Sequence, residues 1–432
     1  MPPKNVKMKD KKGKNKKKRI LFFPYAHQFG STAPLVEMAR FLKQQGHEVL
    51  VAGEGPYMQL AQNVGLDTEK VYGVPYEVYR KAIFSGKYSE VFSPNFLHDM
   101  LQADELLIKK FGPDLIIHFL RFSIPITAHK YNIVAAGVSG INTTPWFAGP
   151  IEIPKLQPEL RFLSIVKSDF LLSKIWRFGM EFVSRKNLSR LIKYLSEKDL
   201  YKIQKHHLEL ILGKDFVLFF DCDYIFRLTK NIPINSIVLG PIINNLVERP
   251  LNKTQLHQLE QWKKEGKYIV FVNLGSSTAD KESITKMILS NNKNIKNRLA
   301  YVIAGFNEDL STVNKMFKQN IIIDKIFNVR EIGKYADILI THGGKGSLYD
   351  SLAYDMYPIV IPNSSEQELN GLVFQRHGLA RVVYRNDIAG LPNILNQLPS
   401  LMHEFRKLLP DIRHRVLSNE WQNKLINLVN SI

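Results

Sequence analysis

Cysteine is nearly absent from the sequence, and long apolar runs are missing altogether. The 432 residues contain one cysteine, Cys222, which excludes an internal disulfide framework and is typical of a reducing compartment. No uninterrupted apolar run approaches the roughly 18 residues of a membrane-spanning helix, and the N-terminal segment lacks the apolar centre of a secretory signal peptide. We therefore expect a cytoplasmic protein that does not span a membrane.

Acidic residues are scarce relative to basic ones, and the excess is concentrated at the N-terminus. The chain has 59 Lys and Arg against 40 Asp and Glu, a net charge of +19. Residues 1–19 hold nine lysines and Arg19 against Asp10, which gives +9 for this segment and leaves +10 for the rest. A segment with so few apolar residues predicts a disordered basic tail. Such a tail either aids solubility or attracts anionic lipid or nucleic acid. Peripheral contact with an anionic membrane and a nuclear address are two possible roles of the tail, and we expect no specific nucleic-acid partner.

The length and the pattern of apolar segments predict two α/β domains. A chain of 432 residues exceeds what one core usually holds. Short apolar runs alternate with helical patterns, which is typical of parallel sheets that bind ligands at the carboxyl ends of their strands. The first such turn lacks the GxGxxG pattern, which argues against a dinucleotide enzyme. We expect domains at 20–243 and 257–397, a linker at 244–256, and C-terminal helices at 398–432 interrupted at Pro410. The expected strands include 19–24, 47–52, 113–119, 133–138, 216–220, 268–277, 301–305, 321–324 and 336–340, and the expected helices include 35–45 and 103–111.

A glycine-rich loop follows the apolar run at 336–340 and precedes a predicted helix at 347–354. Small residues allow a ligand to approach the backbone, and the free N–H groups at a helix N-terminus attract an anion. The loop is not a Walker A sequence, because Lys345 is followed by Gly346 rather than by Ser or Thr. The strand, loop and helix together predict a site for a phosphorylated ligand.

This stretch resembles the donor-binding motif of family 1 glycosyltransferases, the UDP-glycosyltransferases. In that motif a His, a Gly and a Ser precede an acidic residue, two prolines and an acidic-Gln pair. The matching residues are His342, Gly344, Ser347, Asp350, Pro358, Pro362, Glu366, Gln367 and Asn370. The resemblance implies a GT-B fold, in which two Rossmann-like doubly wound domains face a central cleft. The donor would bind the second domain and the acceptor the first, and the C-terminal helix would cross back to the first domain.

The same resemblance implies which residues bind the donor. They are Gly275, Ser276, His342, Gly343, Gly344, Gly346, Ser347, Asp350, Glu366 and Gln367. The loop and the helix N-terminus would hold the diphosphate, Glu366 and Gln367 the transferred sugar, and Asp350 would lie near the ribose. Lys345 is open to two interpretations, a contribution to the phosphate site or, as we expect, a solvent-facing lysine. The implied reaction uses no metal and no cofactor other than the UDP-sugar co-substrate.

The catalytic base is where the sequence departs from the family. Members usually carry a histidine three residues before the proline of the first helix, and Ser31 occupies that position before Pro34. A serine hydroxyl is too weak a base to replace imidazole unaided. His27 lies in the same loop and His118 ends a predicted strand, so each is a candidate base. Each is also compatible with a packed or hydrogen-bonded histidine.

The segment 156–212 is helical in pattern, basic and rich in aromatics. Between Lys155 and Lys205 there are 12 Lys and Arg against 5 acidic residues. These helices either line an apolar acceptor cleft or form a basic surface that touches a membrane. Both arrangements imply a hydrophobic acceptor. Together with the family resemblance, this leads us to expect an inverting hexosyltransferase that moves a sugar from a UDP-sugar to a hydroxyl of a small hydrophobic or lipid acceptor. The alternatives are a nucleotide-sugar epimerase of the same fold and a sugar-nucleotide-binding protein that has lost its base.

Overall fold

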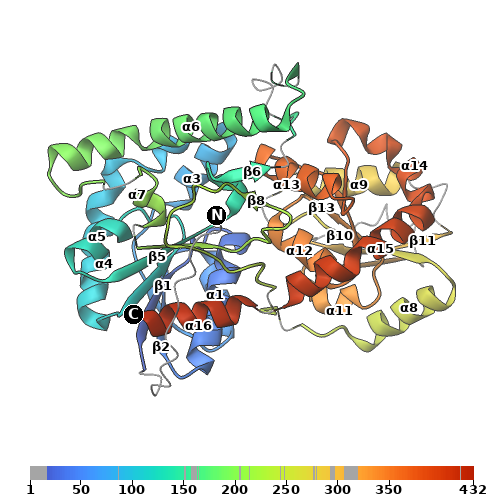
Figure 1. The fold of residues 1–432 in the computed structure, drawn as a ribbon. Helices are drawn as coiled ribbons and strands as arrows, with labels where there is room; N and C mark the ends of the chain where they lie inside the picture. Colours follow the sequence, from blue (N-terminus) through green and yellow to red (C-terminus); the bar gives the residue numbers. More distant parts are fainter. Residues whose placement is uncertain are drawn as a thin grey trace.

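The chain folds into two α/β domains that lie side by side (Figure 1). The computed structural model describes residues 17–85, 87–149, 152–156, 163, 165–203, 206–213, 215–243, 245–247, 249–275, 278, 280–291, 297–305, 320–418 and 420–432. Most of the predicted basic tail lies outside these residues. Arg19, which we expected to end the tail, belongs to the first strand, where its guanidinium lies 3.2 Å from Glu48.

The first domain is built on a seven-stranded parallel sheet of order β3-β2-β1-β4-β5-β7-β9. Its strands are β1 (Arg19–Phe23), β2 (Glu48–Gly53), β3 (Asp67–Lys70), β4 (Leu115–His118), β5 (Val134–Ser139), β7 (Phe216–Phe219) and β9 (Ser236–Val238). The chain builds outward from β1 to β3 and then returns to place β4 on the other side of β1. Loops that leave β1 and β4 in opposite directions open a crevice at this switch point.

Helices cover both faces of this sheet. They are α1 (Phe29–Gln44), α2 (Gln59–Asn63), α3 (Tyr76–Ser85), α4 (Pro94–Phe111), α5 (Ile124–Lys130), α6 (Asp169–Glu197) and α7 (Glu209–Leu212). Successive residues of β1 alternate between the faces: Ile20 and Phe22 pack with α1, and Leu21 and Phe23 pack with α4 and α5. A small antiparallel pair, β6 (Phe147–Gly149) and β8 (Arg227–Leu228), stands apart from the sheet.

Helix α1 begins six residues before the predicted Leu35. Thr32 and Ser31 donate their hydroxyls to the carbonyl of Gln28, at 2.6 and 3.2 Å, and so support the first turn. Pro34 therefore lies inside the helix rather than at its start. Much of the predicted active-site loop at 25–33 is helical as a result.

The second domain carries a six-stranded parallel sheet of order β12-β11-β10-β13-β14-β15. Its strands are β10 (Tyr268–Asn273), β11 (Leu299–Ala304), β12 (Ile321–Asp324), β13 (Ile338–Thr341), β14 (Tyr357–Val360) and β15 (Arg381–Val382). Its helices include α8 (Lys253–Lys264), α9 (Lys281–Asn291), α11 (Val329–Gly333), α12 (Lys345–Ala353), α13 (Ser365–Arg376) and α14 (Leu391–Asn396). A capping box of Asn252 and Gln255 starts α8, so the last residues of the expected linker 244–256 are helical.

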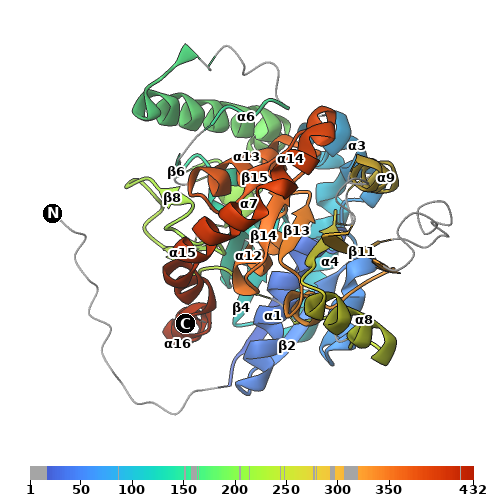
Figure 2. The ribbon, with the colours of Figure 1, turned by 90° about the vertical axis from the view of Figure 1, so that its right-hand side faces the viewer.

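Two helices end the chain, α15 (Leu398–Leu417) on the second domain and α16 (Glu420–Ser431) on the first (Figures 1 and 2). Trp421 of α16 packs edge-on against Phe41 of α1, with ring centroids 5.2 Å apart. The predicted interruption at Pro410 is wrong, because α15 runs through this residue. Met402, Phe405 and Ile412 keep a helical spacing into the core, and this packing offsets the proline's cost of about 3 kcal/mol. No helix among the described residues is long and apolar enough to cross a membrane.

Candidate donor and acceptor site

Two glycines hold the ring of His342 in the loop between β13 and α12. A Cβ atom on Gly275, which has φ +74°, would lie 2.3 Å from Cε1 of His342. A Cβ atom on Gly344 would lie 2.7 Å from Nε2 of the same ring. Gly343 has φ +91°, and a Cβ there would lie 2.7 Å from the carbonyl oxygen of Gln367. Glycine is thus required at Gly343 and Gly344 in this loop and at Gly275 in the loop after β10, and the two loops meet at the His342 ring.

Helix α12 presents its N-terminus beside this ring. It begins at Lys345, two residues earlier than predicted, with Gly344 as its N-cap. A glycine N-cap has no side chain to accept hydrogen bonds from the first-turn N–H groups. Gly346 is exposed and has open space around its Cα, and Ser347 is half-buried. This arrangement leaves room for an anion to approach the start of the helix.

Burial shifts two titratable groups near this helix in opposite directions. It lowers the pKa of His342 to about 4, so the imidazole is neutral at pH 7. It raises the pKa of Asp350 to about 7, so about half of these carboxyl groups are protonated at neutral pH. Nδ1 of His342 is buried and has no hydrogen-bond partner among the described residues. The His342 ring beside the start of α12 is therefore neutral, and its Nδ1 is available for a further hydrogen bond.

Lys345 does not face solvent, which corrects our expectation. Its Nζ lies 2.6 Å from Oδ2 of Asp221, which follows β7 in the first domain, and both side chains are buried. The ammonium also lies 4.8 Å from the ring centroid of Phe226. Any Cβ atom on Gly140 would come within 2.2 Å of Nζ, so a glycine is needed where the lysine enters the first domain. Lys345 thus links the donor loop to the first domain instead of reaching a phosphate.

Further buried polar contacts cross between the domains at α13. Nδ2 of Asn142 donates to Oδ1 of Asn370 at 2.7 Å, and Nδ2 of Asn370 donates to the carbonyl of Gly343 at 3.0 Å. The buried Glu368 carboxylate accepts the N–H groups of Lys155 and Leu156 at 2.5 and 2.8 Å. Asn370 of the motif is therefore a bridge between domains. Sequence reasoning missed Asn142 and Glu368, because neither lies in a recognisable pattern.

Glu366 and Gln367 occupy the first turn of α13 next to the His342 loop. Oε1 of Gln367 accepts the N–H of Asn363 at 2.9 Å, so its amide NH₂ is the group that can donate to a ligand. Glu366 is exposed. Burial raises the pKa of Tyr88 in the first domain, and the negative charge of Glu366 raises it further. Burial, Tyr88 and Glu366 likewise raise the pKa of Tyr79. The acidic-Gln pair therefore stands at the junction of the two domains.

A pocket in the first domain opens at the switch point between β1 and β4. Its lining includes Tyr25, His27, Glu54, Tyr79 and Arg121, from the loops after β1, β2 and β4 and from α3. The Arg121 guanidinium donates to the buried Asp104 carboxylate at 2.8 Å, which neutralises its charge. The rest of the lining is mostly apolar and includes three aromatic side chains, Tyr25, Tyr79 and Phe119, beside the His27 imidazole and the Glu54 carboxylate.

His27 has the geometry of a neutral base. Its Nε2 lies 3.2 Å from the carbonyl oxygen of Val74, so in the neutral ring this nitrogen carries the proton and Nδ1 keeps its lone pair. Nδ1 is buried and without a partner among the described residues. Burial lowers the pKa of His27, more than the contact with Val74 and the charge of Glu54 raise it. Tyr25 packs edge-on against the ring, with centroids 5.2 Å apart.

The other two candidate bases are placed differently. The Ser31 hydroxyl is buried and donates to the carbonyls of Tyr25 and Gln28 at 2.8 and 3.2 Å, so it supports α1. His118 is completely buried, and Gly213 packs close to its Nε2. Burial lowers the pKa of His118 to about 3, and the ring is not among the groups that line the pocket. Of the three, only His27 borders the pocket.

Of the two donor residues expected after β10, Gly275 is described and Ser276 lies outside the described residues.

A cluster of possible metal ligands lies apart from the contacts between the domains. Glu181, His206 and His207 place ligand atoms within 4.8 Å of one another, between α6 and the segment before α7. Three of the four ring nitrogens have partners: Nδ1 of His206 accepts the N–H of Leu208 at 3.1 Å, Nε2 of His206 lies 3.5 Å from Glu181, and Nε2 of His207 lies 2.7 Å from the Ser184 hydroxyl. Nδ1 of His207 is buried without a partner among the described residues. This cluster is internally hydrogen-bonded and distant in sequence from the donor loop.

Comparison with known proteins identifies the architecture. Residues 269–416 match the model of the glycosyltransferase family 28 C-terminal domain. The solved glycotransferase of kitacinnamycin superposes with a TM-score of 0.71 at 16% identity, over 96% of this chain and 99% of that one. The chain has the GT-B glycosyltransferase fold. Glycosyltransferase SnogD from Streptomyces nogalater gives a TM-score of 0.61 at 17% identity, over 96% and 100% of the two chains. Glycosyltransferase VinC in complex with DTDP gives 0.64 at 15%, also over 96% and 100%.

These GT-B matches cover both domains, and they confirm the predicted fold. The matched family model is that of family 28, whereas the motif resemblance pointed to family 1. The matched region includes β13, α12 and α13, and so contains the whole glycine loop and the acidic-Gln pair. No curated protein sequence matches the chain.

Proposed function

We propose that this GT-B protein is an inverting, metal-independent glycosyltransferase that moves a sugar from a UDP-sugar to a hydroxyl of a small hydrophobic or lipid acceptor. One observation carries the proposal: Asn370 and Lys345 of the motif contact Asn142 and Asp221 of the first domain at 2.7 and 2.6 Å, and the charge of Glu366 helps to raise the pKa of Tyr79, a residue of the His27 pocket. Tyr79 in turn packs on Tyr25, with centroids 4.5 Å apart, and Tyr25 packs on His27. The motif residues of one domain and the candidate base of the other thus share one junction.

On the donor side, the start of α12 and the His342 ring would bind the diphosphate. Free first-turn N–H groups and the helix dipole favour negative charge there. A neutral His342 donates one N–H and needs no counter-charge of its own. Glu366 and the Gln367 amide would hydrogen-bond the sugar hydroxyls. Interactions that strengthen as charge develops on the leaving diphosphate lower the barrier to transfer.

On the acceptor side, His27 would remove the proton of the attacking hydroxyl. Its lone pair on Nδ1 takes the proton, the acceptor oxygen forms a bond to the anomeric carbon, and the bond from that carbon to the diphosphate oxygen breaks. The bonding electrons leave with the nucleoside diphosphate. Attack from the face opposite the leaving group inverts the anomeric centre. A base held neutral by burial is suited to this step at pH 7.

Calorimetric titration with UDP, with TDP and GDP as comparisons, tests the donor site. TDP is included because the solved VinC structure contains DTDP. Release of UDP from UDP-glucose is then measured with and without a mixture of phenol and lipid acceptors. We expect UDP to bind and release to depend on acceptor. Turnover without acceptor would favour an epimerase, and binding without turnover would favour a sugar-nucleotide-binding protein. Absence of nucleotide binding would contradict the assignment of the loop.

The basic tail and the lipid acceptor raise the question of where the protein works. We propose that the enzyme contacts anionic membranes peripherally. The charge of +9 in residues 1–19 supports such an attraction.

A further inference from the structure

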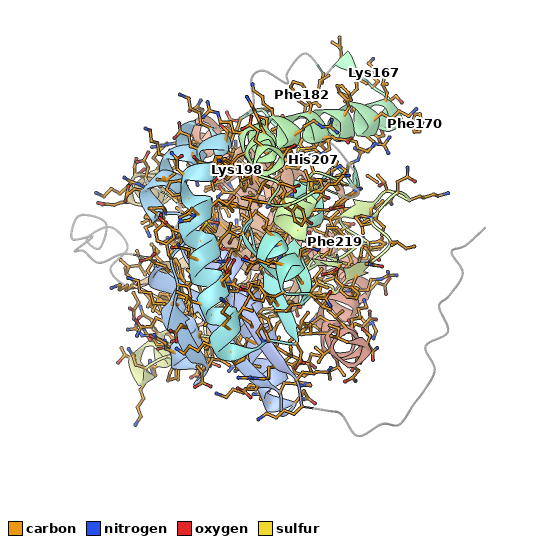
Figure 3. The ribbon with its side chains drawn as sticks, turned by 90° about the vertical axis from the view of Figure 1, so that its left-hand side faces the viewer. Lys167, Phe170, Phe182, Lys198, His207 and Phe219 are labelled. Carbon is orange, nitrogen blue, oxygen red and sulfur yellow. The ribbon has the colours of Figure 1, made fainter. Side chains whose placement is uncertain are left out.

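Helix α6 carries an exposed aromatic stripe along one edge of the molecule. The exposed fractions of Phe170, Phe178 and Phe182 are 71%, 73% and 60%. The buried side chains of α6 are Leu172, Leu188, Leu191 and Leu195, and between Leu172 and Leu188 the half-buried Trp176 packs against the core. Figures 1 and 2 place α6 along the upper edge, and in Figure 3 Phe170 and Phe182 extend from it at the surface. Spacings of 8 and 4 residues bring the three rings to neighbouring positions on the helix.

Basic residues surround these rings. Lys174, Arg185 and Lys186 are exposed, and Nζ of Lys174 lies 4.4 Å from the ring centroid of Phe170. We define the α6 face by these six residues, three phenylalanines and three cations. Two acidic residues of α6 form ion pairs, Asp169 with Arg376 and Glu197 with Lys193. The third, Glu181, lies 3.5 Å from His206, whose pKa is lowered by burial. The α6 face therefore presents positive charge next to apolar surface.

We propose that the α6 face docks on a membrane that contains anionic lipid. A single helix on the outer edge suits a flat surface, with phenylalanine rings entering the interfacial region and Lys and Arg at the headgroup level. Like charges would oppose the pairing of two α6 faces from two copies of the chain. Each cation near an anionic membrane surface adds to the attraction. The chemistry of the face therefore favours anionic lipid over a second copy.

Docking through α6 would bring the acceptor pocket to the membrane. Leu188 and Leu191 of α6 share a hydrophobic cluster with Tyr79 and Met100, both of which line the pocket. This inference rests on the proposed function only in the choice of a lipid acceptor. It assigns the membrane contact to α6 in addition to the basic tail.

Sedimentation of the full chain with vesicles tests the proposal. The vesicles are phosphatidylcholine alone and phosphatidylcholine mixed with phosphatidylglycerol. We expect binding to the mixed vesicles, weakened by salt, and a loss of about tenfold or more in the combined variant Phe170→Ser, Phe178→Ser and Phe182→Ser. Leu106→Ser is the matched control, because Leu106 of α4 is also 71% exposed and lies outside the α6 face. It should bind like the wild type, whereas Lys174→Glu combined with Arg185→Glu should bind more weakly.

Three outcomes would overturn the proposal. The first is unchanged vesicle binding in the triple serine variant together with its loss when residues 1–16 are removed, which would assign all binding to the tail. The second is a wild-type dimer by light scattering that the triple variant converts to a monomer. The third is equal loss in Leu106→Ser. UDP titration of the same variants should be unchanged. Absence of UDP binding in the wild type would contradict the transferase assignment, whereas vesicle binding through the α6 face would still be tested by the variants.

Discussion

The buried ion pair between Lys345 and Asp221 gives the sharpest test of the structure. Lys345→Ala removes the cation and leaves a buried carboxylate, and removal of one partner of a buried pair costs about 3–5 kcal/mol. The lower end applies here, because Asp221 keeps the N–H of Ile141 at 2.5 Å and the Tyr349 hydroxyl at 3.2 Å. We therefore expect the variant to lose about 3 kcal/mol of unfolding free energy.

Urea unfolding followed by circular dichroism measures this loss. With a slope of about 3 kcal/mol per molar urea, the midpoint falls by about 1 M. Lys334→Ala is the matched control, because Lys334 forms a partly exposed ion pair with Glu331 at 2.8 Å. Such pairs contribute about 0.5 kcal/mol or less. The combined variant Lys345→Met and Asp221→Asn should be more stable than the sum of its single changes predicts, because neither charge is left alone.

Equal midpoints for Lys345→Ala and Lys334→Ala would refute this reasoning. That result would mean that Lys345 faces solvent in solution and that the domains meet differently. The donor loop would then be free to place the ammonium on a phosphate, as the alternative sequence interpretation holds.

The remaining predictions concern the glycine loops around His342, the candidate base His27 and the carboxyl group of Asp350. Gly275→Ala should destabilise the fold by about 2 kcal/mol or more and weaken UDP binding at least about tenfold, because its Cβ collides with a buried ring. Gly346→Ala has open space and should gain up to about 1 kcal/mol, yet still weaken UDP binding if the diphosphate approaches there. His27→Ala should leave UDP affinity unchanged and lower turnover about 100-fold or more, whereas Ser31→Ala should leave turnover intact. Unchanged turnover in the His27→Ala variant would exclude His27 as the base. The folded pKa of Asp350, about 7, lies above its ordinary 3.8, so its contribution to stability is present at low pH and lost as pH rises through 7. In urea titrations, the unfolding free energy of Asp350→Asn should therefore exceed that of the wild type by about 1–2 kcal/mol near pH 8 and by less near pH 5. A difference that stays constant with pH would contradict the raised pKa of Asp350.

The sequence was sufficient for the fold because the relevant signals are local. Apolar runs such as 338–341 and 268–273 are buried on both sheet faces along most of their length and can be recognised from the sequence alone. The glycine loop was readable for the same reason, since strand, glycines and helix start follow one another directly. Element ends were less accessible: the hydroxyl bonds that extend α1 backward and the core packing that carries α15 through Pro410 depend on neighbours in space.

The contacts between the domains could not be predicted in this way. Lys345 and Asp221 are 124 residues apart, and Asn142 and Asn370 are 228 apart. Nothing in the local pattern of a glycine loop distinguishes a lysine that binds phosphate from one that enters a neighbouring domain. The buried Asp221 carboxylate and the space beside Gly140 receive the lysine, and both become visible only in three dimensions.

These contacts make the donor loop a part of the domain junction itself. Asn370 joins the Gly343 carbonyl to Asn142, and Lys345 joins the first turn of α12 to Asp221. The short segment that we propose offers its backbone to a diphosphate is thus held from the first domain at two points. Opening of the junction would withdraw both supports from the loop, and a bound nucleotide that orders the loop would favour the closed junction by the same free energy. In the proposed mechanism, this geometry would couple donor binding to the approach of His27, so that the base would be in place when the sugar is.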